Sequence, residues 1–253
     1  MGATRFEYRF RFLIHAVIYM LGFWSPWVYW GNVFGFTDKS TWLVLASSLW
    51  RLKGVNVSEA SIGVLMVAMV FAGLGAWFRV WGTAYVSAGV VASRDMHGTA
   101  MLADGPYRRT RNPLYLGTLL HTIGLSILMP PSGAIFAVAL LWAFQIRLAL
   151  AEEPFLTAQF GKAYLEYAAR VPRFVPALTP RVPAAGAMPH WGQALLGELY
   201  FVGAFVVLAT LGWSFNANPL RQGILISLGV WLVVRAFMPS ANNVPAAPTE
   251  STQ

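Results

Sequence analysis

The 253-residue sequence contains no cysteine and few charged residues. The absence of cysteine excludes disulfide bonds, thiolate catalysis and cysteine-ligated metal sites. Charged residues make up 11% of the chain, against about 25% in a typical soluble domain, and 57% of the residues are hydrophobic. Long apolar runs account for this difference. The composition therefore predicts an integral membrane protein, built as one helical bundle without a separate soluble domain.

Acidic residues are scarce as well, because the chain has 10 of them against 18 lysines and arginines, a formal net charge of +8. The basic residues lie beside apolar runs, which favours anionic lipid headgroups over nucleic acid as their partners. The first apolar run is about as long as a membrane span and no small-residue cleavage site follows it, so we expect no cleavable signal peptide. The sequence also lacks a glycine-rich phosphate loop of the dinucleotide-binding type.

Six apolar stretches predict six membrane spans in an all-α, polytopic helical bundle. They cover residues 12–30, 61–80, 114–129, 134–150, 195–215 and 220–238. Residues 42–50 are apolar but too short to span, which predicts an interfacial or re-entrant segment. Residues 176–189 are rich in proline and alanine and are expected to form a linker, and the polar residues after 239 are expected to be disordered.

The third and fourth spans are separated by a short turn at residues 130–133, which predicts an antiparallel helical hairpin. A hairpin returns the chain to the side of the membrane that it left, so Arg111 and Glu152 are expected on the same side. With six spans, fourteen of the 18 lysines and arginines fall on the side of both termini and four on the other. The positive-inside rule then predicts that the termini, Arg111 and Glu152 are cytoplasmic.

Two polar segments flank this hairpin. The first polar segment, residues 105–117, reads GPYRRTRNPLYLG and carries three arginines where a polar loop becomes an apolar helix. Pro113 fixes the start of that helix and disfavours a helical conformation at Asn112. A guanidinium suits planar recognition of carboxylates or phosphates, but arginines at a membrane boundary also act as topology signals and snorkelling anchors. Charge alone leaves both interpretations open.

The second polar segment, residues 152–176, begins with Glu152 and Glu153, which we expect at the C-terminal end of the fourth span. Adjacent carboxylates there oppose the helix macrodipole unless cations compensate them, and the arginines of the first segment could do so. Tyr164 and Tyr167 share one face if this stretch is helical. An aromatic face near a carboxylate suits a cation such as a sulfonium. The alternative is an amphipathic helix lying on the bilayer.

The two segments, in this order and around a hairpin, resemble the membrane-embedded isoprenylcysteine carboxyl methyltransferase family and the related phospholipid N-methyltransferases. The resemblance covers about residues 95–176. The family pattern Arg-x-x-Arg-His-Pro-x-Tyr-x-Gly is met at Arg108, Arg111, Pro113, Tyr115 and Gly117. The paired acids, the tyrosine pattern and the Val-Pro-Arg pattern are met at Glu152, Glu153, Phe160, Gly161, Tyr164, Tyr167, Val171, Pro172 and Arg173.

The resemblance implies S-adenosylmethionine bound on the cytoplasmic side and a lipid or prenylated acceptor that enters from the bilayer. The implied cofactor-binding residues are Tyr107, Arg108, Arg111, Asn112, Pro113, Tyr115, Gly117, Glu152, Glu153, Tyr164 and Tyr167. Arg173, on the acceptor side, and Glu153 are the candidates for catalysis. Asn112 replaces a histidine of the family and cannot act as a general base near neutrality. An anionic acceptor needs no base, whereas an amine would leave Glu153 as the proton acceptor.

We therefore expect membrane spans over residues 1–94, a methyltransferase core over 95–180, a two-span hairpin over 190–239 and a tail over 240–253. His121 and Glu198 lie within spans, where polar groups are costly, and are further candidates for ligand contact. The expected function is S-adenosylmethionine-dependent methylation of a membrane-embedded acceptor. Carboxyl O-methylation is most similar by family, and phospholipid amine N-methylation is the alternative.

Two other functions compete with methyl transfer. In a membrane lipid reductase, Arg108 and Arg111 would hold the phosphates of NADPH. A transporter or scaffold would require charges at mid-membrane or paired broken helices, and the sequence shows no convincing example of either. No metal is expected in any of these interpretations.

Overall fold

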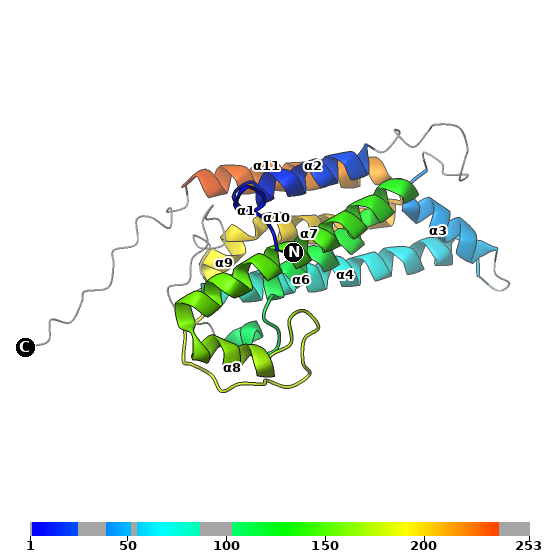
Figure 1. Ribbon diagram of the computed structural model, residues 1–253. Helices are drawn as coiled ribbons and strands as arrows, with labels where there is room; N and C mark the ends of the chain where they lie inside the picture. The colour runs from blue at the N-terminus through cyan, green and yellow to red at the C-terminus, as the bar shows by residue number, and fades with distance from the viewer. Residues whose placement is uncertain (1, 25–38, 52–54, 87–102, 238–253) are drawn as a thin grey trace, which may run out of the picture.

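The computed structural model describes residues 2–24, 39–51, 55–86 and 103–237. Within these ranges the ordered elements are helices and no strand is present, so the expected all-α membrane bundle is confirmed (Figure 1). In chain order they are α1 (Arg5–Arg9), α2 (Arg11–Phe23), α3 (Thr41–Trp50), α4 (Val57–Val86), η2 (Gly105–Arg108), α6 (Pro113–Ser126), α7 (Pro131–Phe160), α8 (Lys162–Arg170), α9 (Trp191–Gly197), α10 (Leu199–Leu211), η3 (Gly212–Ser214) and α11 (Ala217–Phe237).

Three described helices, α4, α7 and α11, are long and apolar enough to cross a membrane, and the bent pair α9–α10 makes a fourth if it is one span. The helices expected as the first and third spans are shorter, because α2 has 13 residues and α6 has 14. At 1.5 Å per residue each is about 20 Å long, less than the roughly 30 Å hydrocarbon core. Residues 25–30 of the first expected span lie outside the described residues.

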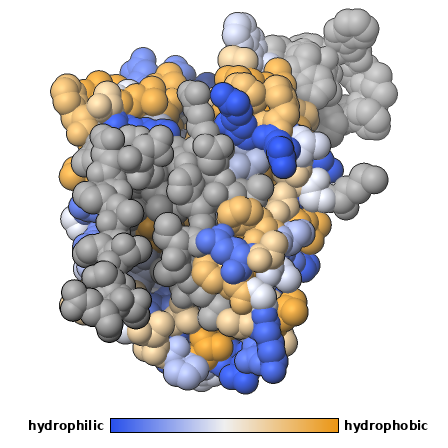
Figure 2. All heavy atoms as spheres, turned by 60° about the vertical axis from the view of Figure 1, so that its left-hand side comes forward, coloured by the Kyte–Doolittle hydropathy of each residue, from blue (hydrophilic) through white to orange (hydrophobic). Residues whose placement is uncertain are grey.

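Apolar side chains cover much of the outer surface. On α11, Ile226 and Val233 are 65% and 60% exposed, and on α4 Val67 is 56% exposed. The face shown in Figure 2 carries hydrophobic areas, most clearly along its upper edge, next to strongly hydrophilic groups. Since lipid tails do not penalise exposed aliphatic groups, this surface fits a bundle surrounded by bilayer.

Helices α4 and α6 pack with their backbones nearly in contact. A Cβ atom added to Gly75 would lie 2.6 Å from the backbone nitrogen of His121, and one added to Gly124 would lie 2.7 Å from that of Ala72. Gly75, Ala68 and Ala72 of the second expected span therefore serve close helix packing, as predicted, whereas Gly63 of that span faces open space. Gly117 belongs to the same contact, since a Cβ there would lie 2.8 Å from the carbonyl oxygen of Gly75.

Helix α7 extends beyond the apolar run that predicted it. It continues to Phe160 and contains Pro154, so Glu152 and Glu153 lie inside the helix and the placement of the acids at its C-terminal end was wrong. The helix ends where Gly161 adopts a φ of 55°, a conformation that glycine reaches without a steric penalty. The helix therefore ends just before this glycine, at Phe160, ten residues beyond the end of the apolar run at residue 150.

The expected linker at residues 176–189 packs against the first polar segment. Ala177 and Arg181 donate backbone hydrogen bonds to the carbonyls of Arg109 and Arg108, at 2.9 and 2.8 Å. The buried carboxylate of Asp104 accepts bonds from three successive backbone N–H groups, those of residues 185–187. In Figure 1 this return segment and α8 lie together at one end of the bundle. Residues 176–189 therefore pack on the first polar segment and help to hold it in place.

Candidate active site

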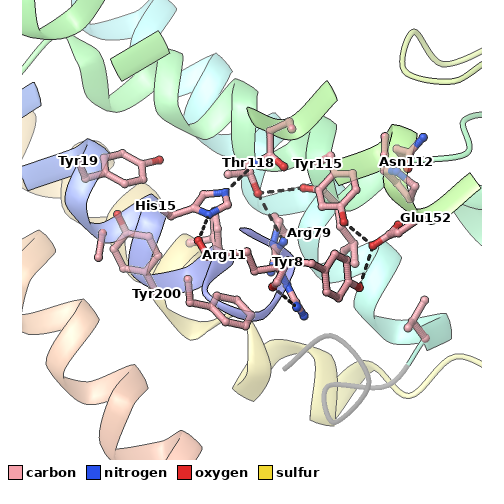
Figure 3. A pocket seen from close by; sticks show the side chains of 18 of the residues that line it. Tyr8, Arg11, His15, Tyr19, Arg79, Asn112, Tyr115, Thr118, Glu152 and Tyr200 are labelled. Carbon is pink, nitrogen blue, oxygen red and sulfur yellow. Dashed lines mark hydrogen bonds between the residues drawn. The ribbon is translucent and has the colours of Figure 1, made fainter. Parts of the chain in front are cut away.

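A cavity of about 950 Å³ runs from the two polar segments into the bundle, between α2 and α11. At its polar end Tyr107, Tyr115, Glu152, Tyr164 and others line the wall. Farther in, the lining is mainly apolar and comes from α2 and from residues 221–235 of α11. Figure 3 shows Tyr115 and Glu152 close together, with Arg79 toward the middle and Tyr19 and Tyr200 beyond it. The cavity therefore joins a charged compartment to an apolar one.

Glu153 joins the two polar segments through arginines. Arg111 Nη1 donates to its Oε1 at 2.8 Å, and Arg173 donates from Nε and Nη2 to Oε1 and Oε2 at 2.7 and 2.8 Å. These bonds raise the pKa of the Arg173 guanidinium, which stays charged. The expected compensation of the acids by arginines is therefore correct for Glu153. Because both its oxygens accept from guanidinium groups, Glu153 suits an anchor for two arginines better than a proton acceptor.

Glu152, the residue before Glu153, accepts hydrogen bonds from tyrosine hydroxyls and not from arginines. The hydroxyls of Tyr8 and Tyr115 both donate to its Oε1, and the Tyr8 bond is 2.9 Å long. Glu152 lines the cavity beside these two rings (Figure 3). The two phenols thus orient this carboxylate toward the cavity, where a bound cation could pair with it.

The N-terminal helix brings Tyr8 to this position. Glu7 forms bidentate hydrogen bonds with Arg147 of α7 at 2.8–3.2 Å, and the Ala3 N–H donates to the Arg147 carbonyl. Thr4 and Glu7 form a capping box that starts α1. The Arg147 bonds lower the pKa of Glu7 to about 2. Sequence reasoning did not single out Tyr8, because 144 residues separate it from Glu152.

The two tyrosines of α8 lie on one face, as predicted, and both are buried. Their ring centroids are 6.0 Å apart, and the Tyr167 hydroxyl donates to the Tyr107 carbonyl at 2.9 Å. Burial raises the pKa of the phenols of Tyr107, Tyr164 and Tyr167, so they remain neutral donors. All three line the cavity and form an aromatic wall next to the acids.

Asn112 and Pro113 also line the cavity, whereas Arg108 and Gly117 lie elsewhere. Asn112 Nδ2 donates to the Arg173 carbonyl at 3.0 Å and so fixes the second polar segment. Arg108 Nε donates to the Val182 carbonyl at 2.9 Å, because the η2 turn directs it to the return segment. Gly117 lies in the α4–α6 contact described above. The structure therefore separates these two from the other predicted cofactor residues.

A charged side chain, that of Arg79, lies at the middle of the cavity. From the sequence alone, this arginine contributed only to the predicted orientation in the membrane. Arg79 of α4 lines the cavity, and its Nε and Nη2 donate to Oε2 and Oε1 of Glu198 at 2.8 Å each. The side chains of Arg79 and Glu198 are 12% and 1% exposed. An arginine inside a long apolar helix was the available signal for such a site.

Glu198 and His121 do not themselves line this cavity. Glu198 occupies the break between α9 and α10, where the helix axes differ by 73°. His121 is buried, with its ring edge-on to Tyr200 and Phe201. Among the described residues, no group of three or more His, Asp or Glu side chains could hold a metal ion.

Comparisons with known proteins agree with this geometry. Residues 63–163 match the phospholipid methyltransferase family model. Protein-S-isoprenylcysteine O-methyltransferase B of Arabidopsis thaliana is 34% identical over 101 residues, 37% of this chain and 51% of that protein. The protein-S-isoprenylcysteine O-methyltransferase of Schizosaccharomyces pombe is 31% identical over 116 residues, 43% of this chain and 48% of that protein. The chain therefore spans about half the length of these two methyltransferases.

A longer match at lower identity links the chain to a nickel-cobalt-cadmium resistance protein of Alcaligenes xylosoxydans xylosoxydans, 23% identical over 187 residues, 73% of this chain and 82% of that protein. No solved structure matches. The family model covers most of α4, the first polar segment, the α6–α7 hairpin and the paired acids, whereas Tyr8, Tyr164 and Tyr167, which also line the polar end of the cavity, lie outside it. These matches show that the chain is similar to the phospholipid methyltransferase family and to protein-S-isoprenylcysteine O-methyltransferases over the part that contains the hairpin and the paired acids.

Proposed function

We propose that the protein transfers a methyl group from S-adenosylmethionine to a lipid or lipidated acceptor held within its helical bundle. The observation that carries this proposal is the continuity of one cavity from Glu152 at its polar end to the apolar walls of α2 and α11. A polar donor and an apolar acceptor can meet inside such a cavity without leaving the protein.

The polar end has groups that fit S-adenosylmethionine. Tyr164, Tyr167 and Tyr107 provide an aromatic wall for an adenine ring or a sulfonium. Glu152 provides a negative charge for the ammonium group of the donor. Arg111 Nε is buried and has no hydrogen-bond partner among the described residues, and such a donor suits the carboxylate of the methionine part.

The protein groups contribute binding, orientation and exclusion of water. When bound, the cofactor supplies a methyl group on a positively charged sulfur, a chemically reactive donor that needs no metal. Because the reaction is a direct displacement, its rate depends on holding the acceptor atom in line with that methyl group in a site shielded from water. Asn112 does not titrate, and Glu153 is bound by two arginines, so this arrangement favours an acceptor that is already an anion over an amine.

The apolar part of the cavity suits the hydrocarbon part of the acceptor. Leu225, Leu228 and Leu232 of α11 face Phe12, Ala16 and other residues of α2 across it. The named methyltransferase relatives act on S-isoprenylcysteine, a molecule with such a hydrocarbon part. We place the polar end and both termini on the cytoplasmic side, from the distribution of lysines and arginines.

The test is thermal unfolding of the purified protein in detergent with S-adenosylmethionine, S-adenosylhomocysteine or NADPH. A ligand at about 100 times its dissociation constant adds roughly 2.7 kcal/mol to the free energy of unfolding. We expect stabilisation by the two adenosyl compounds only, its loss in Glu152→Gln and Arg111→Ala, and its retention in the matched control Arg108→Ala. Stabilisation by NADPH alone would show a reductase, and equal loss in Arg108→Ala would contradict the site assignment.

A further inference from the structure

We propose that Arg79 binds an anionic group of the acceptor, and that Glu198 is a positioning residue that holds Arg79 in place. This inference rests on the proposed methyl transfer and adds a specificity-determining residue to it. Arg79 belongs to α4, whereas Glu198 lies in the α9–α10 break, outside the residues that match the family model.

The geometry of the ion pair leaves one edge of the guanidinium for a ligand. Nε and Nη2 are bound to Glu198 at 2.8 Å, whereas Nη1 donates to Thr118 Oγ1 at 3.4 Å, beyond the usual range for an N–H···O bond. The arginine carbon Cζ lies 4.5 Å from the centroid of the Phe201 ring, which supports the planar group from one face. Because a guanidinium has five N–H donors in a fixed plane, an anion in the cavity can bind at the Nη1 edge.

The negative charge of Glu198 is hidden from the cavity. Its carboxylate accepts three hydrogen bonds, two from Arg79 and one from Thr83 Oγ1 at 2.6 Å, and its side chain is 1% exposed. A ligand in the cavity therefore meets the guanidinium and not the carboxylate. Apolar side chains would hold two helices together as well as a buried ion pair does, so packing alone does not require a charge at this position.

The distribution of charge along the cavity supports an anion at Arg79. The acidic lining residues, Glu152 and Glu153, both lie at the polar end. The basic lining residues are Arg111, which pairs with Glu153 at the polar end, and Arg11, Arg79, Arg221 and Arg235. In Figure 3 Arg79 lies between the end marked by Tyr115 and Glu152 and the end marked by Tyr19 and Tyr200. A cationic donor at Glu152 and an anionic acceptor at Arg79 would thus face each other at the boundary of the two compartments.

The reaction is balanced without a further reagent. A lone pair of the acceptor anion, such as a carboxylate oxygen, forms the bond to the methyl carbon as the carbon–sulfur bond breaks, and that electron pair stays on sulfur. The products are a neutral methyl ester and the neutral thioether, so no proton moves. Methylation removes the charge that Arg79 recognises, which weakens its hold on the product and favours release into the lipid.

The experiment compares matched single-chain amphiphiles as probes: palmitate, hexadecanol and hexadecylamine. Their dissociation constants are measured on the full chain in phosphatidylcholine nanodiscs, with and without saturating S-adenosylhomocysteine. Arg79→Met alone leaves Glu198 buried without its partner and can fail to fold, so the main variant is the double replacement Arg79→Met, Glu198→Met. Arg79→Lys tests rescue by a conserved charge, and Arg221→Met is the matched control at another cavity-lining arginine.

We expect the wild type to bind palmitate more tightly than the other two probes. The double variant should lose at least about tenfold in palmitate affinity, the size expected for a charge-assisted hydrogen bond, and should bind hexadecanol as the wild type does. Arg79→Lys should recover part of the preference. Unchanged palmitate affinity in the double variant, an equal loss in Arg221→Met, or a wild-type preference for hexadecylamine would each overturn the inference. If S-adenosylhomocysteine does not bind the wild type, the proposed function is wrong. The anion site at Arg79 is tested separately from this, because the affinities of the probes are also measured without S-adenosylhomocysteine.

Discussion

The ion pair between Arg79 and Glu198 predicts strongly non-additive effects of mutation on stability. In Arg79→Met, the carboxylate of Glu198 keeps only the Thr83 hydroxyl of its three hydrogen-bond donors and remains in a site where it is 1% exposed. In Glu198→Met, the guanidinium loses both of its 2.8 Å bonds. Breaking a buried pair by removing one partner typically costs about 3–5 kcal/mol, whereas replacing both partners by apolar groups is often nearly neutral.

We therefore expect each single variant to lose about 3–5 kcal/mol of unfolding free energy and the double variant to lose much less than their sum. The measurement is denaturant titration of the wild type, both single variants and the double variant in mixed micelles, followed by tryptophan fluorescence. Because the Arg79 that remains in Glu198→Met is 12% exposed, that variant should lie toward the lower end of the range, and Arg79→Met, which leaves Glu198 in a site where it is 1% exposed, toward the upper end. Additive losses, or single variants as stable as the wild type, would refute the view that the two charges stabilise each other.

Two further predictions concern the N-terminal helix and the helix contact. Because the pKa of Glu7 is lowered to about 2 from its ordinary 4.5, its bonds to Arg147 stabilise the fold above about pH 4.5, and this contribution is lost as the pH falls through about 2. Between about pH 4.5 and pH 2, the free energy of unfolding of Glu7→Gln should therefore decrease less than that of the wild type. An equal decrease in both proteins would show that the Glu7–Arg147 bonds do not stabilise the fold. A Cβ on Gly75 would lie 2.6 Å from a backbone nitrogen, so Gly75→Ala should cost at least about 1–3 kcal/mol in thermal unfolding. The matched control Gly63→Ala faces open space on the same helix and should gain about 0.5–1 kcal/mol, so similar effects at both sites would count against the α4–α6 contact.

Much of the polar end could be predicted from local sequence because its parts are close in the chain or joined by the hairpin. Arg111 and the paired acids are separated by the α6–α7 hairpin alone, and their placement on the same side followed from that topology, although the bond from Arg111 to Glu153 in particular did not. Tyr164 and Tyr167 share a helical face as their spacing required. Arg108 and Gly117 satisfy the same motif, but their side-chain directions depend on the η2 turn and on the approach of α4, which no motif specifies.

The contacts that α1 and the α9–α10 break make with the cavity could not be predicted in this way. Tyr8 contacts Glu152 only because the Glu7–Arg147 ion pair docks α1 on α7, a contact between residues 140 apart in sequence. Glu198 contacts Arg79 because α9 and α10 bend at that residue, and the sequence there shows neither proline nor a polar run that would mark a break. Both contacts depend on tertiary packing, since nothing in local periodicity brings their partners together.

The central claim, transfer of a methyl group to a membrane-embedded acceptor, is tested most directly by following a radiolabelled methyl group. Membranes containing the wild type, Arg111→Ala or Arg108→Ala are incubated with methyl-labelled S-adenosylmethionine and extracted with organic solvent. We predict wild-type-dependent label in the lipid-soluble fraction, its loss in Arg111→Ala and its retention in Arg108→Ala. Equal label in membranes with and without the protein, at a concentration of S-adenosylmethionine that saturates binding, would contradict the account.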